Sequence, residues 1–546
     1  MPTETSSNTC PRIYDDGIDN QLASNVKYDK INRKSELLKN SDFLFICQSI
    51  VFCSSEKYIC PSIREIVIDF FYKRVDNKKY NFTENYNVGV VKMKVVKFGG
   101  SSLANGTQLE KVFHIVMSEP ERKVVVVSAP GKRYSDDIKV TDLLITLGEK
   151  CLAGQDTTEE FNTIVNRYAS IAEELNIPET VIEQIKNDLR AIMDREEKDT
   201  VLFIESMKAA GEDNNAKLVA AYFQSKGVEA YYVNPKEAGI YVTNEPGSAQ
   251  ILPESYDLIY KLRDRSGILI VPGFFGYNKE GDVLTFSRSG SDITGSILAN
   301  GVKADLYENF TDVDAVYTVN PTIVKKPKEI RELTYREMRE LSYAGFSVFH
   351  DEALIPAFRA GIPVQVKNTN NPSAPGTKIV SSRENTNGPV VGIASDDGFC
   401  SIYIGKYLMN REVGFGRRLL QILEDFHLSY EHVPSGIDDI TVILREKQLT
   451  EEIKTAVINR IKEELHADEV KIEHHLALIM VVGEGMRRNV GTTSRAAKAL
   501  AAAGINIDMI NQGSSEVSMM FGVKEEDEKK AVQALYNEFF ANVLVG

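Results

Sequence analysis

The stretch KVVKFGGSS, residues 94–102, is the most informative part of the sequence. Its apolar residues predict a short buried β-strand that runs directly into a turn of small residues. A Gly-Gly pair lets backbone N–H groups approach a polyanion closely, because no Cβ atom stands in the way. Lys97 adds a compact positive charge, and the two serines add hydroxyl donors. This pattern is typical of a phosphate-binding turn, although a glycine pair after a strand is more often only a turn.

Two later segments carry polar residues of a matching kind. The segment FSRSGSDITG, residues 286–295, is rich in glycine and hydroxyl groups and holds Arg288 and Asp292. Asp292 could also simply cap the helix predicted over residues 293–299. The segment NFTDVDAVYTVNP, residues 309–321, reads as a strand broken by two acids. Those acids are either turn formers or contacts to a nucleotide and metal.

In this order, the three segments resemble aspartate kinases of the amino-acid-kinase family. The family patterns are a KFGG[ST]S turn, an R-x-G-S-D stretch and TDVD-x-[VI]-YT-x-[DN]P, and the resemblance covers about residues 93–546. The sequence departs from the pattern at Pro130-Gly131-Lys132, where many relatives have a shorter turn rich in serine and alanine. The charged residues of the pattern remain, so the departure indicates a distinct branch with the activity retained.

Length and composition limit the class of protein. A chain of 546 residues predicts about three or four domains. The net charge of −14 argues against an extended nucleic-acid surface and for a cytoplasmic enzyme. No run approaches the roughly 18 apolar residues of a membrane span. The six cysteines form no CxxC pair, which favours free thiols in a reducing compartment.

The chain divides into four predicted parts. Residues 1–92 lack sustained periodicity and are interpreted as an atypical extension, with Met93 as the hypothetical true start. Residues 93–385 alternate strands with helices, which predicts an α/β fold with a mainly parallel sheet and helices on both faces. Predicted strands lie at 123–128, 267–275 and 364–367, and ligands on such sheets gather at the carboxyl ends of strands.

A smaller unit follows twice, at 391–470 and 471–546. Its β-α-β-β-α-β rhythm is that of a ferredoxin-like module. Paired modules of this kind resemble ACT domains, which bind amino acids and regulate. The alternative is that they only join subunits.

The resemblance implies phosphorylation of the side-chain carboxylate of aspartate by ATP with Mg²⁺. This reaction needs no strong base, because a carboxyl group with a pKa of about 4 is ionised at pH 7. The barrier lies in bringing two anions together and neutralising charge on the transferring group. Lysines, backbone amides and a metal brought by ATP are therefore expected, with no metal ion held by the protein alone.

The resemblance also assigns roles to individual residues. Lys97 would touch the phosphates, Asp292 would hold the lysine and the metal-bound phosphate in register, and the remaining ATP contacts would be Gly99, Gly100, Ser101, Thr311, Asp312, Tyr317 and Lys328. The aspartate contacts would be Glu212 for the ammonium group, Arg288 for the α-carboxylate, and Ser128, Thr141 and Ser291 for position.

Each role has a simpler alternative. Lys97 could be a solvated lysine at a strand end, Arg288 and Asp292 a loop salt bridge, and Glu212 an acid favoured by a helix dipole.

In the paired modules, small polar loops suit the amino and carboxylate groups of a free amino acid. The predicted effector contacts are Met409, Asp438, Asp439 and Asn511. Lysine, with or without threonine, is the effector that the resemblance implies, together with a homodimer or larger homo-oligomer formed through the ACT domains. Another kinase of the same fold, acting on acetylglutamate, glutamate or a nucleoside monophosphate, is the nearest rival. A non-catalytic amino-acid sensor is a further alternative.

Overall fold

The computed structural model describes residues 92–195, 199–346, 349, 352–383, 388–513 and 517–541. The chain separates into two units, residues 1–90 and 91–546, and every described element belongs to the second. The predicted N-terminal extension, residues 1–92, therefore lies outside the described residues except for Lys92. Among the helices of the described ranges, none combines the length and apolar character needed to cross a membrane.

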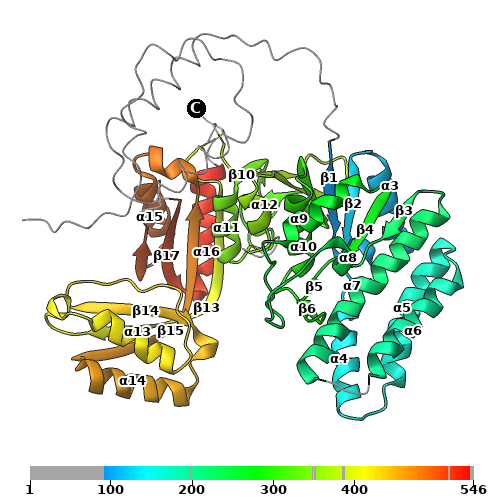
Figure 1. Cartoon of the computed structure of the whole chain (residues 1–546). Coiled ribbons are helices and arrows are strands. Elements are labelled where there is room, and N and C mark those ends of the chain that lie inside the picture. Colours follow the sequence, from blue (N-terminus) through cyan, green and yellow to red (C-terminus); the bar gives the residue numbers. More distant parts are fainter. Residues whose placement is uncertain are drawn as a thin grey trace, which may run out of the picture. The chain divides into compact units, whose positions relative to one another are not determined.

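An eight-stranded sheet forms the first part of the described chain (Figure 1). Its spatial order is β10-β12-β11-β7-β1-β2-β4-β3, and only the β11/β12 pair is antiparallel. In chain order the strands are β1 Lys94–Phe98, β2 Arg122–Val127, β3 Ala230–Tyr232, β4 Ile268–Pro272, β7 Leu306–Thr311, β10 Glu332–Thr334, β11 Val364–Asn368 and β12 Thr377–Val380. This mainly parallel sheet confirms the predicted α/β class.

Helices cover both faces of this sheet. Side chains alternate between two apolar cores, with Val95 facing one core and Val96 the other. One core is covered by helices α3 Gly106–Met117, α4 Val140–Leu152, α5 Thr158–Leu175, α6 Glu179–Met193 and α7 Thr200–Ser225. The other core is covered by α9 Ser255–Tyr260, α10 Gly290–Gly301, α11 Tyr335–Tyr343 and α12 Ile355–Arg359. Lys97 lies two residues after Val95 and so faces the same side as α10.

A five-stranded antiparallel sheet forms the C-terminal part, in the order β14-β13-β15-β17-β16. Its strands are β13 Gly392–Gly405, β14 Asp439–Arg445, β15 Glu469–Val482, β16 Met509–Asn511 and β17 Ser518–Lys524. Its helices are α13 Phe415–Asp425, α14 Glu451–Leu465, α15 Thr492–Ala502 and α16 Glu528–Tyr536. The two predicted modules therefore share one sheet, because the 14-residue strands β13 and β15 run through both.

The apolar cores show how the two modules are connected. The first core holds residues of α13 and α14 with the second half of β13, from Cys400 to Ile404. The second core holds residues of α15 and α16 with Ile393, from the first half of β13. In the packing, the first module is thus inserted within the second. The predicted domain limits, including the division between 470 and 471, stay a prediction.

A buried ion pair crosses the central strand of the eight-stranded sheet. Arg122 opens β2 and Glu308 lies in β7, with β1 between them. The arginine donates from Nε to Glu308 Oε2 at 2.6 Å and from Nη2 to Oε1 at 2.9 Å. Both side chains are 3% exposed. Such a pair fixes the relation of three adjacent strands, two of which, β1 and β7, lead into segments singled out in the sequence.

We expect Glu308→Gln to destabilise the fold by about 3–5 kcal/mol, because it leaves the buried Arg122 charge without its main partner. Chemical unfolding followed by circular dichroism measures the loss. Glu119→Gln is a matched control, since Glu119 pairs with the same arginine at 2.7 Å but is 36% exposed. That control should cost less than about 1 kcal/mol. Equal losses for the two variants would contradict a special contribution from the buried pair.

Candidate active site

The predicted phosphate turn begins where β1 ends, beside the ends of β2 and β7. The Gly99 amide donates to the Phe310 carbonyl at 3.1 Å, and the Ser128 amide donates to the Phe98 carbonyl at 3.2 Å. Residues Gly100–Leu103 then form a short 3-10 helix. The start of the turn is thus held between the end of β7 and the first residue after β2.

The turn and the loop after β2 approach each other backbone to backbone. The Gly131 amide donates to the Gly100 carbonyl at 2.9 Å, and a Cβ atom on Gly131 would lie 2.5 Å from the Gly100 carbonyl carbon. Only glycine permits this approach. The glycine in the Pro130-Gly131-Lys132 departure therefore has a structural reason.

A buried arginine on α5 anchors the same loop. Arg167 on α5 donates to Asp137 Oδ1 at 2.7 Å and to the Gly131 carbonyl at 2.9 Å. Asp137 Oδ2 also accepts from the Arg133 backbone amide at 2.9 Å and its Nε at 2.8 Å. The hydrogen bond from Arg133 is the largest cause that holds the pKa of Asp137 well below its usual range. Sequence reasoning missed this anchor, because its two ends lie 30 residues apart and match no short motif.

Lys97 and Asp292 form an ion pair next to the turn. Lys97 is the penultimate residue of β1, and Asp292 lies in the first turn of α10. Lys97 Nζ lies 2.5 Å from Asp292 Oδ1, and the side chains are only 8% and 11% exposed. The helix dipole favours a carboxylate in that first turn. The two residues predicted to be catalytic are thus brought together.

Glu212 is buried in the middle of α7 and faces the same region. Burial raises the pKa of Glu212 to about 8, against opposing effects of the Ala129 backbone, the charge of Lys97 and the Ser291 hydroxyl. Its Oε2 atom has no hydrogen-bond partner. A buried carboxylate oxygen without a partner is costly, and a bound cation would satisfy it. The structure therefore does not favour the simpler interpretation of Glu212 as an acid held by a helix dipole, because that effect is confined to the first turn and Glu212 lies in the middle of α7.

A cavity of about 570 Å³ opens at this edge, within the size range of small-molecule sites. Among the predicted residues, its lining includes Gly100, Ser101, Ser128, Thr141, Glu212 and Asp312. Lys132, Arg133 and Lys139 also line it. Sequence reasoning gave these three cations no role, although their density between 130 and 140 was a usable signal.

The other predicted site residues lie in three places. Arg288 is exposed and Ser291 is buried at the start of α10, next to Asp292. Thr311 ends β7 and its hydroxyl contacts Asp312 at 3.2 Å. Tyr317 is in β8 Val316–Tyr317, and Lys328 lies just before its partner strand β9 Glu329–Ile330. Within the described ranges, the lining of the cavity includes none of the remaining predicted residues, namely Lys97, Gly99, Arg288, Ser291, Asp292, Thr311, Tyr317 and Lys328.

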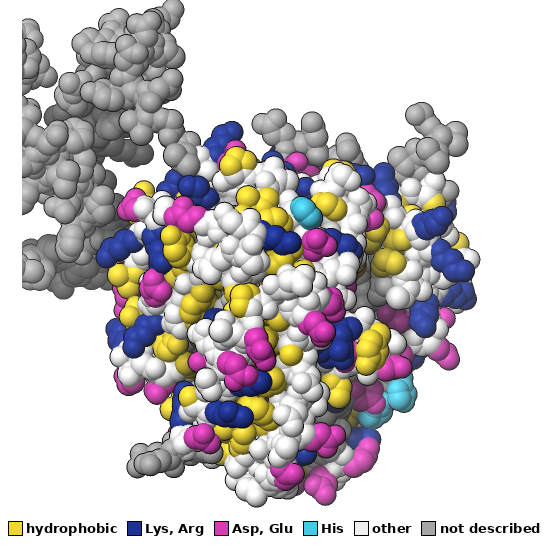
Figure 2. All heavy atoms as spheres, turned by 90° about the vertical axis from the view of Figure 1, so that its right-hand side faces the viewer, with side chains coloured by type: hydrophobic (Ala, Val, Ile, Leu, Met, Phe, Trp, Pro, Cys, Tyr) yellow, Lys and Arg dark blue, Asp and Glu magenta, His cyan; other side chains and the backbone are white. Residues whose placement is uncertain are grey.

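The face of the molecule turned toward the viewer in Figure 2 mixes acidic and basic side chains without separating them into large areas. Across the described ranges, no three His, Cys, Asp or Glu side chains come together as a protein-held metal ion would require.

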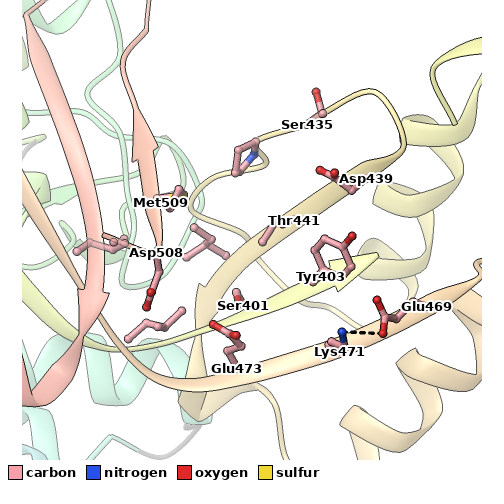
Figure 3. A pocket seen from close by; sticks show the side chains of 16 residues that line it. Ser401, Tyr403, Ser435, Asp439, Thr441, Glu469, Lys471, Glu473, Asp508 and Met509 are labelled. Atoms are coloured by element: carbon pink, nitrogen blue, oxygen red, sulfur yellow. Dashed lines mark ion pairs between the residues drawn. The ribbon is translucent and has the colours of Figure 1, made fainter. Parts of the chain in front are cut away.

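The predicted effector residues lie in adjacent segments of the first module, except for Asn511, but they do not line one cavity of the described chain. Met409 is buried in the core of the first module, and Asp438 accepts a hydrogen bond from the Leu408 amide at 2.7 Å. Asn511 lies in β16, where its side-chain amide is 3.2 Å from His432 Nδ1. Asp439 lines a separate groove of about 550 Å³ on the five-stranded sheet. Figure 3 shows Asp439, Glu473 and Asp508 around this groove, with Lys471 paired to Glu469 at 2.6 Å.

Comparison with known proteins identifies the family. A sequence model of the amino acid kinase family matches residues 92–368, and one of the ACT domain matches residues 479–539. Aspartokinase 3 of Bacillus subtilis strain 168 is 71% identical over 453 residues, which cover 83% of this chain and 100% of that protein. The chain belongs to the aspartokinase family. The predicted family is thereby confirmed.

Solved aspartokinase structures share the fold. The aspartate kinase of Clostridium acetobutylicum is 38% identical with a TM-score of 0.74, over 82% of this chain and 100% of that one. Escherichia coli aspartokinase III was solved with aspartate and ADP in the R-state, and with lysine and aspartate in the T-state. Each of these two is 25% identical with a TM-score of 0.66, over 82% of this chain and 100% and 99% of theirs.

We expect Asp137→Asn to lower the melting temperature of this aspartokinase at neutral pH, because the loop loses the carboxylate that pairs with Arg167 and Arg133. A carboxyl group whose pKa is depressed by folding contributes stability above its unfolded pKa of about 4, and loses it as pH falls toward the folded value. The difference in melting temperature from the wild type should therefore be constant from pH 8 to 5 and narrow below about pH 4.

The exposed neighbour Asp136 provides the control, since Asp136→Asn changes the same charge in the same loop. The anchoring role would be contradicted if Asp136→Asn lowered the melting temperature as much as Asp137→Asn does. It would also be contradicted if the melting-temperature difference of Asp137→Asn stayed the same down to the acid transition.

Proposed function

We propose that this aspartokinase transfers the γ-phosphoryl group of ATP to the side-chain carboxylate of L-aspartate, giving 4-phospho-L-aspartate. The observation that carries the proposal is the unpartnered buried oxygen of Glu212, which lines the cavity and lies close enough to the paired Lys97 to feel its charge. The relative from E. coli, solved with aspartate and ADP, supports the same pair of ligands.

In this proposal the ATP phosphates lie on the turn after β1. The Gly100 and Ser101 amides face the phosphate oxygens, and Lys97 neutralises charge as the phosphoryl group moves. Gly99 lines the turn without a side chain, because its own amide is bonded to the Phe310 carbonyl. Asp292 keeps the Lys97 ammonium in place. Thr311, Asp312 and Tyr317 flank the nucleotide, and Lys328 reaches its phosphates.

Aspartate occupies the part of the cavity next to Glu212. The Glu212 carboxylate accepts the ammonium group, and Arg288 pairs with the α-carboxylate, for which a guanidinium fork is well suited. Ser128, Thr141 and Ser291 set the position of the substrate. The side-chain carboxylate is then free to attack the γ-phosphorus, and no protein base is required, because it is already ionised.

Mg²⁺ fits this site as an ion that arrives with ATP. It prefers oxygen ligands and keeps several waters, binding through one or two carboxylates and the phosphates of its substrate. Asp312, exposed in the cavity, is a carboxylate of that kind. The ion would neutralise charge on the β- and γ-phosphate oxygens.

We further propose that this enzyme works in the cytoplasm and opens the synthesis of lysine, threonine and methionine. Free lysine, with or without threonine, would bind the paired modules near Met409, Asp438, Asp439 and Asn511 and inhibit the kinase, in a homodimer or larger homo-oligomer. The T-state of the E. coli relative, solved with lysine, supports lysine as an effector. Such feedback requires lysine to bind one arrangement of the enzyme more tightly than another.

The reaction is tested by trapping the acyl phosphate with hydroxylamine. We expect hydroxamate from ATP and L-aspartate, little from glutamate or acetylglutamate, and suppression by lysine. Hydroxamate that forms equally with and without lysine or threonine would support the kinase reaction and contradict the proposed feedback. Absence of hydroxamate with aspartate would overturn the proposed function.

The role of Glu212 predicts proton release on aspartate binding. With a pKa of about 8, the group is mostly neutral at pH 7, and a bound ammonium favours its charged form. Aspartate affinity should therefore rise with pH from 6 to 8. Calorimetry in buffers of different ionisation enthalpy measures the released protons.

Glu212→Gln keeps the shape but cannot release a proton. We expect this variant to raise the KM for aspartate by about 10- to 100-fold, the value of one hydrogen bond to a charged group, and to remove the buffer dependence. Proton release of equal size in the variant would assign it to another group.

A further inference from the structure

A buried amide shares the carboxylate oxygen that Lys97 binds. Asn309 on β7 is the register partner of Lys97 on the parallel strand β1, so the two side chains leave the sheet on the same face. Asn309 is 3% exposed, and its Nδ2 donates to Asp292 Oδ1 at 2.6 Å. The contact of Lys97 Nζ, at 2.5 Å, is to the same oxygen. One oxygen therefore receives two donors from neighbouring strands.

Tyr307, two residues earlier on β7, extends this arrangement to the backbone of Asp292. Its hydroxyl donates to the Asp292 carbonyl at 3.2 Å and receives the Asn309 amide at 3.3 Å. Burial raises the pKa of Tyr307 well above its usual value, so the hydroxyl remains a donor. The ring fits against α10 because residue 295 is glycine, where a Cβ atom would lie 2.4 Å from the hydroxyl oxygen.

We propose that Asn309 is a positioning residue for phosphoryl transfer, acting through Asp292. Without the amide, the Asp292 carboxylate could rotate toward Lys97 and hold the ammonium away from the phosphates. With the amide bound, Oδ1 stays between the two strands, and the other ammonium hydrogens of Lys97 remain directed at the phosphate turn. The family pattern begins at Thr311 and gives Asn309 no role. This inference rests on the proposed roles of Lys97 and Asp292.

The alternative is that Asn309 is only a buried polar group with its hydrogen bonds satisfied, which would affect stability and not the chemical step. The two interpretations differ in the kinetic constant that changes. A positioning residue lowers kcat and kcat/KM together, because its effect is expressed in the transition state. A purely structural residue lowers the melting temperature and leaves the kcat of the folded enzyme unchanged.

Asn309→Leu removes the donor and keeps similar bulk. In the hydroxamate assay we expect kcat to fall by about 10- to 100-fold, the range seen when a hydrogen bond that orients a functional ligand is lost. The KM values for ATP and aspartate should change by less than about threefold, since uniform binding is retained. A kcat within about twofold of the wild type would overturn the inference.

A matched control lies at the far end of α10, the helix that carries Asp292. Asn300 on α10 is also buried, and its Nδ2 donates to the Pro356 carbonyl at 3.0 Å. Asn300→Leu loses a comparable buried amide bond away from the site. We expect it to lower the melting temperature like Asn309→Leu, with kcat unchanged. An equal fall of kcat in both variants would show that Asn309 acts only through stability.

A second variant adds a pH-dependent measurement and serves if leucine prevents folding. Asn309→Asp differs from the wild type in one group and places a carboxylate against Asp292 Oδ1, where two such groups cannot both ionise easily. Its kcat should fall more steeply than that of the wild type as pH rises from 6 to 8.5. Parallel pH profiles would contradict the inference.

Asp292→Asn separates this inference from the proposed function. If that variant is inactive while the Asn309 variants match the wild type, only the positioning role fails. If Asp292→Asn keeps the wild-type kcat, the proposed role of the ion pair fails as well.

Discussion

The ion pair of Lys97 and Asp292 is the constraint on which the catalytic part depends. Both charges are nearly hidden from water, and a buried charge without its partner costs several kcal/mol. β1 and α10 must therefore meet within a narrow tolerance. Parallel pairing of β1 with β2 and β7 provides this, because it places three strand ends at one edge of the sheet. The Arg122–Glu308 pair then fixes the two outer strands across the middle one.

Much of this arrangement could be predicted from local sequence. The apolar run before Gly99 indicated β1, and the strand predicted at 364–367 lies within β11. The family resemblance also predicted six residues that line the cavity: Gly100, Ser101, Ser128, Thr141, Glu212 and Asp312. What escaped prediction is held by partners distant in the chain: Arg167 with Asp137, Arg122 with Glu308, and Asn309 with Asp292. Their residue types are common, and no spacing marks them as pairs.

The paired modules show a different limit of sequence reasoning. The β-α-β-β-α-β rhythm could be found from the sequence, but the repeat suggested two separate units in series. Strands β13 and β15 are instead long enough to serve both. The effector residues were chosen by the polarity of their loops, which does not reveal side-chain direction. Met409 accordingly points into an apolar core, while Asp439 faces a groove.

The insertion of one module within the other has a consequence for how such chains can be recombined. The chain enters the first module along β13 and returns from it along the adjacent strand β15. The two boundary positions face each other, since Phe399 pairs with Leu476. A tight hairpin joining these two positions would excise the first module as a single cassette and keep the strands of the second in register. A cut between 470 and 471 would instead divide β15 and separate the second module from its own first strand. The first module is thus the simplest part to exchange between related enzymes, because its exchange needs only two junctions, which lie on neighbouring strands.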